Sequence, residues 1–213
     1  MSLFLQSLLI GVSIAAPVGP IGLLVIQRTL NHGTARGLAT GLGAAAADAL
    51  YGALGAYGAS SVIGALQRLE RPLAVAGAVF LAWLAWRTWR APLATQAAQA
   101  GAPVAVEGRG VLLAAFAGTF VLTLSNPATI LSFIAIFGTL GVASGGVESP
   151  ATLVAGVAVG SALWWLLLCS GVSALRERFD ARWRRAINAG SALVLLGFAL
   201  WALSAAWRAP AAG

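Results

Sequence analysis

One acidic residue, Asp48, lies inside an apolar stretch of the sequence, and this placement is the clearest sign of chemistry in the chain. The other acidic residues all fall in segments between apolar runs: Glu70, Glu107, Glu148, Glu177 and Asp180. A carboxylate at mid-bilayer costs about 2.5 to 3.5 kcal/mol on insertion scales, so such groups usually face a pathway. Asp48 could therefore carry a proton or pair with an ammonium group, and Tyr51, on a similar helical face, could hydrogen-bond to it. The alternative is a structural acid, protonated and bonded to a neighbouring hydroxyl.

Two proline-containing breaks interrupt apolar stretches at corresponding places in the two halves of the chain. The first is "AAPVGPIGLLVI", residues 15 to 26, and the second is "LSNPATILSF", residues 124 to 133. Asn126 can cap a helix and Pro127 fits its first position; Gly19 and Pro20 can do the same less strongly. Each proline could begin a half-helix whose free N–H groups and positive dipole end would bind a carboxylate. A simple kink, which membrane helices tolerate, is the alternative.

The composition places the whole chain in a membrane. It is 60% hydrophobic and 9% charged over 213 residues, with a mean hydropathy of +0.89, whereas a soluble domain carries about 25% charged residues. Six apolar runs approach or exceed the roughly 20 residues that a membrane helix needs. They are Leu3 to Ile26, Gly37 to Leu66, Leu73 to Trp89, Val111 to Leu140, Thr152 to Ala174 and Ala186 to Trp207. We therefore expect an all-α integral membrane protein with six transmembrane helices.

A small, polar, proline-containing segment divides these runs into two sets of three. Residues 91–110, "APLATQAAQAGAPVAVEGRG", read as a flexible linker. Residues 1–90 would form a first three-helix repeat, and residues 111–213 a second. Because three spans reverse the direction of insertion, the two repeats are expected to be inverted, each with a broken first helix. Such breaks usually mark the substrate site of a transporter.

Arginine placement predicts the orientation. All thirteen basic residues are arginine, and the net charge is +7. Most of them follow the first, third and fifth runs, as a set of cytoplasmic segments would require. They are Arg28, Arg36, Arg87, Arg90, Arg109, Arg176, Arg178, Arg182, Arg184 and Arg185. Both termini are then outside the cytoplasm, and the positive charge needs no nucleic-acid partner. The N-terminus lacks a basic leader and reads as a retained span.

Other kinds of site find little support. His32 and Cys169 each stand alone, so no metal site, disulfide or cofactor is expected. Ser125 and Ser132 have no histidine partner inside the spans, which argues against an enzyme. Small residues in GxxxG spacing, at Gly37 with Gly41 and at Gly156 with Gly160, favour close helix packing and would permit a homodimer.

The residues quoted above resemble the LysE-type amino-acid exporter family. The resemblance lies in "APVGPIGLLVIQRTL", "NHGTARGLATGLGAAAADALYGALGAYG" and "LSNPATILSFIAIFG". It implies a bacterial inner-membrane exporter of amino acids, driven by proton or cation antiport. The matching site positions are Pro17, Gly19, Pro20, Asp48, Asn126 and Pro127. Many relatives have "PGP" at the first break, whereas this chain has Val18 inserted in "PVGP".

The leading hypothesis is therefore export of a small amino acid or related zwitterion. The half-helices that begin at Pro20 and Pro127 would hold the carboxylate, and Asp48 would take the ammonium group or the counter-proton. The partners would be the amino acid and membrane lipid. Export of an inorganic cation or other small ion is the alternative, but one acid and no histidine within the spans make a poor ligand set for a metal.

Overall fold

The protein is helical throughout the part of the chain that the structure describes. The computed structural model describes residues 2–17, 19–57, 72, 75–86, 89–90, 108–126, 129–130, 132–133, 149–175 and 181–208. The labelled helices are α1 (Leu3–Ala15), α2 (Pro20–His32), α3 (Thr34–Ala56), α6 (Arg109–Leu124), α8 (Pro150–Leu175) and α9 (Ala181–Arg208). A further helix spans Val75–Trp86. No strand occurs among these residues, so the all-α prediction is confirmed for them.

The predicted break in the first apolar run is present. Helix α1 ends at Ala15 and α2 begins at Pro20, with the two axes bent by 79°. Gly19 has extended backbone angles (φ −107°, ψ −165°) and precedes Pro20 at the first helical position. Proline suits that position because its missing N–H would have no partner within the helix. The first run is therefore two helices at a steep angle, as the sequence predicts.

The turn after α2 is tighter than the sequence indicates. Residues 27–36 lie between the first two predicted apolar runs, yet α2 continues to His32 and α3 begins at Thr34. Gly33 alone joins them, with φ at 93°, a conformation that residues with a side chain seldom adopt. The second predicted run therefore starts three residues earlier than expected.

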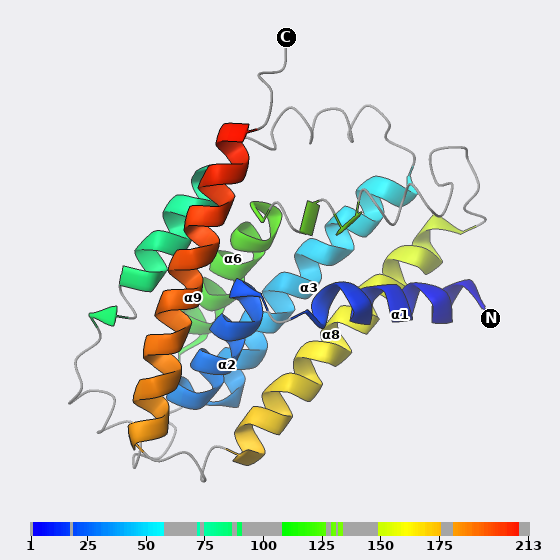
Figure 1. Cartoon of the computed structure of the whole chain (residues 1–213). Coiled ribbons are helices and arrows are strands. Elements are labelled where there is room, and N and C mark those ends of the chain that lie inside the picture. The colour runs from blue at the N-terminus through cyan, green and yellow to red at the C-terminus, as the bar shows by residue number, and fades with distance from the viewer. Residues whose placement is uncertain are drawn as a thin grey trace.

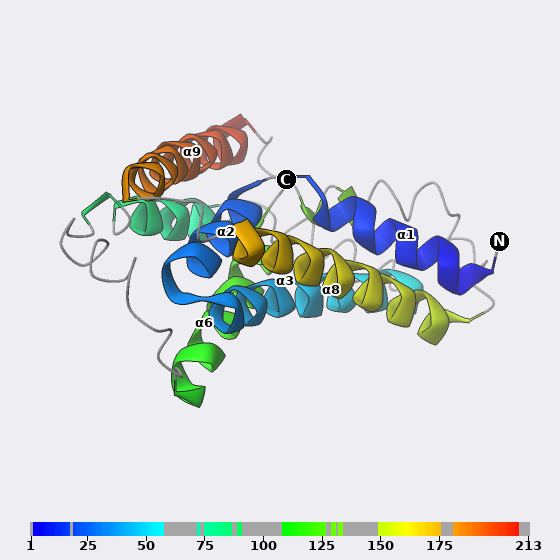
Figure 2. The same ribbon diagram turned by 90° about the horizontal axis from the view of Figure 1, so that it is seen from below.

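The two halves of the chain interleave in one bundle (Figures 1 and 2). Helices α3 and α8 lie side by side, α1 packs along α8, and α6 packs along α3. Helix α2 contacts α3, α8 and α9. Helix Val75–Trp86 lies beside α9, and buried residues of both belong to the same apolar core as Leu24 and Trp165. Helix α3 of the first half thus packs against two helices of the second.

Small residues make these approaches close. A Cβ added to Gly160 would collide with the carbonyl group of Leu8, and one added to Gly156 would lie 2.5 Å from the Cβ of Ser7. A Cβ on Gly41 would meet the side chain of Trp165 at 2.5 Å. The prediction that the GxxxG spacings serve helix packing is confirmed for these three glycines.

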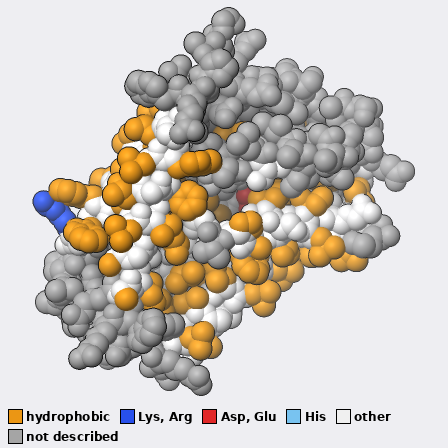
Figure 3. Space-filling model, in the orientation of Figure 1, with side chains coloured by type: hydrophobic (Ala, Val, Ile, Leu, Met, Phe, Trp, Pro, Cys, Tyr) orange, Lys and Arg blue, Asp and Glu red, His pale blue; other side chains and the backbone are white. Residues whose placement is uncertain are grey.

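The described helices have the apolar surfaces of a membrane protein. Helix α8 is long and apolar enough to cross a bilayer, and α1 with α2 forms a second such unit if the bent pair is one span. Apolar side chains cover much of the described surface on the face that α9 occupies (Figure 3). The second, third and fourth predicted runs extend beyond the described residues, so six spans in inverted repeats stay a prediction. Residues 91–107 of the predicted linker also lie outside, and α6 already begins at Arg109.

Candidate functional site

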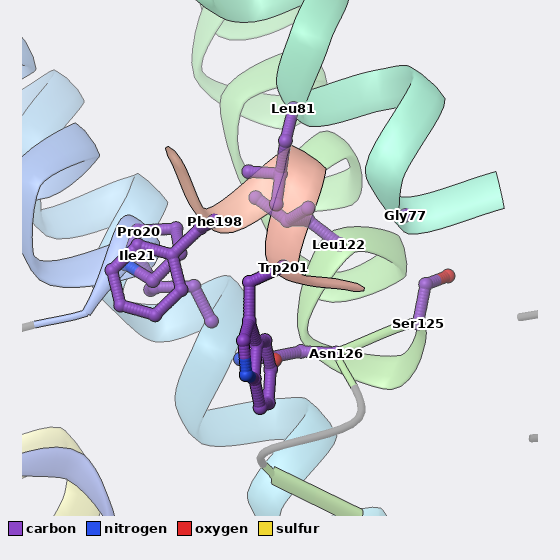
Figure 4. A pocket seen from close by; sticks show the side chains of 9 residues that line it. All are labelled: Pro20, Ile21, Gly77, Leu81, Leu122, Ser125, Asn126, Phe198 and Trp201. Carbon is purple, nitrogen blue, oxygen red and sulfur yellow. The ribbon is translucent and has the colours of Figure 1, made fainter. Parts of the chain in front are cut away.

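A pocket lies where the two predicted breaks meet (Figure 4). Its walls come from the start of α2, the helix Val75–Trp86, the end of α6 and the second half of α9. The lining residues are Pro20, Ile21, Gly77, Leu81, Leu122, Ser125, Asn126, Phe198 and Trp201. These side chains nearly fill the space, which leaves room for about one water molecule. In this structure the pocket therefore admits no more than a water-sized group, and we call this its closed arrangement.

Helix α6 ends just before Asn126, where the second break is predicted. Helix α6 ends at Leu124, and the Asn126 amide donates to the Thr123 carbonyl at 3.2 Å. On its other side, the Asn126 carbonyl accepts the amides of Thr129 and Ile130 at 3.0 and 3.2 Å. A residue whose carbonyl accepts the first bond of a new helical turn occupies an N-cap position. Pro127, the predicted first residue of that turn, lies outside the described residues.

Helix Val75–Trp86 approaches this second break closely. A Cβ added to Gly77 would lie 2.8 Å from the carbonyl oxygen of Ser125. Such a separation is shorter than an ordinary carbon–oxygen contact, so a larger residue would push the two backbones apart. Glycine at position 77 therefore allows the helix Val75–Trp86 to pack against the end of α6 and close the pocket.

Asp48 is buried inside the bundle and is not directed at lipid. Its side chain is 2% exposed, and its Oδ2 accepts a 2.7 Å hydrogen bond from the Ser161 hydroxyl of α8. The indole nitrogen of Trp165 in turn donates to the Ser161 oxygen at 3.2 Å. The acid thus joins α3 of the first half to α8 of the second.

Tyr51 has a different partner from the predicted one. Its hydroxyl donates to the Leu124 carbonyl at 2.7 Å, and its ring stacks on Phe133 with a 5.3 Å centroid separation. A phenol has one proton to donate, so the expected hydrogen bond from Tyr51 to Asp48 is not formed. The correction has a physical reason: the last carbonyls of α6 have no partner within their own helix, and Tyr51 supplies one.

The predicted site residues therefore fall into two groups. Pro20 and Asn126 line the pocket, whereas Pro17 and Gly19 precede α2 and are not among the lining residues. Asp48 and Tyr51 are also absent from the lining. Tyr51 nevertheless reaches Leu124, the neighbour of pocket residue Ser125. Tyr51, three residues after Asp48 on α3, thus connects this helix to the end of α6 beside the pocket.

Arg28 is half-buried and hydrogen-bonded to a neighbouring helix, whereas the sequence indicates a role in orientation alone. Its Nη1 donates to the Thr40 hydroxyl at 2.9 Å and to the Thr119 hydroxyl and Ala115 carbonyl at 3.3 Å. The guanidinium group therefore links α2 and α3 to α6. The signal was present in the sequence as threonines inside apolar runs, since both Thr40 and Thr119 are fully buried. Ser161 and Trp165 gave no comparable signal.

An interrupted apolar helix at a partly polar pocket, with a buried acid on a neighbouring helix, is typical of a membrane transport protein. A family model described as LysE type translocator matches residues 12–205, and the chain belongs to this family. The family resemblance seen in the sequence is therefore confirmed. The chain is 26% identical over 206 residues to a Bacillus subtilis (strain 168) protein named "Putative amino acid efflux protein YcgF", covering 93% of this chain and 94% of that protein. No solved structure shows a significant match.

Proposed function

We propose that this translocator exports a small amino acid or related zwitterion across the bacterial inner membrane, in exchange for a proton or another cation. The observation that carries the proposal is the pocket formed jointly by Pro20 and Asn126, one from each predicted break. The name of the Bacillus subtilis relative, which mentions amino acid efflux, supports the same substrate class.

The two breaks supply the groups that a substrate carboxylate needs. The first turn of α2 has backbone N–H groups without partners in their own helix, and the dipole of α2 is positive at that end. The Asn126 carbonyl accepts the amides of Thr129 and Ile130, as the residue before a helical turn would, so we expect a positive end there as well. Carboxylates bind at such ends. Pro17 and Gly19, which precede α2, would shape the entry of the first break.

Asp48 supplies a negative charge for the substrate ammonium group or for a proton. It is buried and accepts one hydrogen bond from a neutral hydroxyl, so no cation among the described residues neutralises it. A carboxylate in this position can take up a proton or the ammonium group of a substrate. Tyr51, which ties α3 to the end of α6, would pass a change at Asp48 to the second break. In this scheme the two halves rock around the pocket.

The arrangement in the membrane follows from the charges of the sequence. Most arginines follow the first, third and fifth predicted runs, and the proposed orientation therefore keeps both termini outside the cytoplasm. The partners of the protein are then the amino acid and the surrounding lipid. The exposed apolar face of α9 would be available for lipid or for a second copy of the chain.

The proposal is tested with the full chain in proteoliposomes under an imposed pH gradient. A competition panel of labelled and unlabelled amino acids identifies what is carried, and proton movement is followed in the same vesicles. We expect Asp48→Asn to abolish coupled transport, while Glu107→Gln, an acid in the predicted linker, retains it. Full coupled transport by Asp48→Asn removes Asp48 from the mechanism. Uptake of an inorganic cation without any amino acid would instead support the ion-exporter alternative.

A further inference from the structure

Ser161 and Trp165 of α8 form a two-step chain of hydrogen bonds that ends on Asp48. Trp165 Nε1 donates to Ser161 Oγ at 3.2 Å, and Ser161 Oγ donates to Asp48 Oδ2 at 2.7 Å. All three side chains are between 0% and 3% exposed. An indole N–H can only donate, so Trp165 is the donor to Ser161, and an ionised Asp48 can only accept, so the serine hydroxyl donates to the carboxylate.

This direction determines what Asp48 receives. The Trp165 N–H occupies an acceptor position on the Ser161 oxygen, which leaves the serine proton for the carboxyl group. Hydrogen bonds to an ionised acceptor are about twice as strong as bonds between neutral groups. The hydrogen bonds from Trp165 to Ser161 and from Ser161 to Asp48 therefore favour the charged form of Asp48 and hold its carboxyl group in one orientation.

Few titratable or charged groups on the neighbouring helices could also influence the protonation of Asp48. Helices α2, α6 and α8 pack against α3, and the titratable or charged residues on all four are Arg28, His32, Arg36, Tyr51, Arg109 and Cys169. Tyr51 interacts electrostatically with Asp48, but its hydroxyl proton is donated to Leu124. Arg28 contacts Thr40, eight residues before Asp48, which is about 12 Å along a helix. Among the described residues, α8 is thus the source of the hydrogen bond to Asp48.

We propose that Ser161 and Trp165 are positioning residues for the exchange reaction, which orient the Asp48 carboxyl group and set the pH range over which it binds its proton or the substrate ammonium. This inference rests on the proposed role of Asp48 in transport. It also means that protonation of Asp48 affects both halves of the chain, because the acid belongs to the first half and its hydrogen-bond donors belong to the second. Binding of a proton at Asp48 weakens the contact between α3 and α8, one of the places where the two halves meet.

The test follows the protonation of Asp48 directly, without knowledge of the substrate. The full chain is titrated in proteoliposomes by infrared spectroscopy, and the Asp48 band is the carboxylic-acid absorption that Asp48→Asn removes. We expect Ser161→Ala to move the midpoint of this band to higher pH by about one unit, a tenfold change in proton affinity. Trp165→Phe, which keeps the ring and loses the donor, moves it less in the same direction. Ser161→Thr, which keeps the hydroxyl donor, should keep the wild-type midpoint.

Ser173→Ala is the matched control. Ser173 lies on the same helix and accepts a 2.8 Å hydrogen bond from Thr34 of α3, but it lies more than three helical turns from Ser161. Its replacement should leave the midpoint unchanged. If Ser161→Ala does not insert, Trp165→Phe against Ser161→Thr provides the same comparison.

The outcomes separate this inference from the proposed function. A midpoint unchanged in both Ser161→Ala and Trp165→Phe overturns the positioning role and leaves amino-acid export standing. A shift equal to that of Ser173→Ala also overturns it, because the effect is then one of general packing. Coupled transport that survives Asp48→Asn overturns the transport role of all three residues, whatever the titration shows.

Discussion

The hydroxyl group of Tyr51 lies 2.7 Å from the carbonyl oxygen of Leu124, so a side chain of the first half caps a helix end of the second half. Leu124 is the last residue of α6, and the segment that follows turns at Asn126 into the pocket wall. The Tyr51 ring also stacks on Phe133, beyond the turn. Tyr51 therefore contacts the chain on both sides of the second break and holds the break against α3.

Removal of this hydroxyl should destabilise the closed pocket. Tyr51→Phe leaves the Leu124 carbonyl without a donor in an apolar bundle, which costs about 1 to 3 kcal/mol. We expect a lower unfolding temperature in detergent and slower transport. Tyr57→Phe is the control, because Tyr57 is 66% exposed at the end of the same helix. Equal unfolding temperatures for the two variants would contradict the capping role.

Features that depend on local chemistry could be read from the sequence. The break before Pro20 follows from the geometry of proline, and the capping position of Asn126 follows from its residue type. The burial of Asp48 follows from its place in an apolar run, because a carboxyl group is too costly to leave against lipid. The all-helical fold follows from the length of the apolar runs. These features need no knowledge of which helices touch.

Features that depend on contacts between distant segments could not be read in this way. The partner of Tyr51 is 73 residues away and is a backbone carbonyl, which no residue type reveals. Ser161 sits among small residues that look alike in sequence, and its selection depends on how α8 packs against α3. Arg28 follows an apolar run, as an orienting arginine would, but α2 continues past it and turns its side chain into the bundle. Packing decides these roles.

The close contact between α1 and α8 should depend on Gly160. A Cβ at this position collides with the Leu8 carbonyl, and overpacking of this kind costs about 1 to 3 kcal/mol. We expect Gly160→Ala to lower the unfolding temperature and the yield of inserted protein. Gly171→Ala lies on the same helix with no described atom within 4 Å of the added carbon. It should be neutral or stabilising, since alanine is the better helix former by up to about 1 kcal/mol. Similar losses in both variants would show that the Gly160 contact is unimportant.

Arg28 should be required for its geometry and not for its charge alone. Arg28→Lys keeps the positive charge and therefore the predicted orientation, but the lysine side chain is shorter, so its ammonium nitrogen falls short of the place from which Nη1 of Arg28 contacts Thr40, Ala115 and Thr119. We expect a loss of about 2 kcal/mol in stability, measured by thermal unfolding, with the labelling pattern of cysteines placed at the two termini unchanged. Arg109→Lys, at the exposed start of α6, is the control. A stability equal to wild type in Arg28→Lys would return Arg28 to a purely orienting role.

Gly77 should control how readily the pocket opens. An added Cβ would lie 2.8 Å from the Ser125 carbonyl oxygen, so Gly77→Ala strains the closed arrangement in which the helix Val75–Trp86 touches the second break. A strain of about 1.4 kcal/mol that acts in this state alone shifts the balance between closed and open forms tenfold. We expect a cysteine in place of Leu122, introduced with and without Gly77→Ala, to react roughly tenfold faster with a water-soluble maleimide when alanine is present. The control is Gly197→Ala on α9, next to pocket residue Phe198, where an added Cβ meets no described atom within 4 Å. Labelling that Gly77→Ala leaves unchanged, or that both variants accelerate equally, would mean that this glycine does not hold the pocket closed.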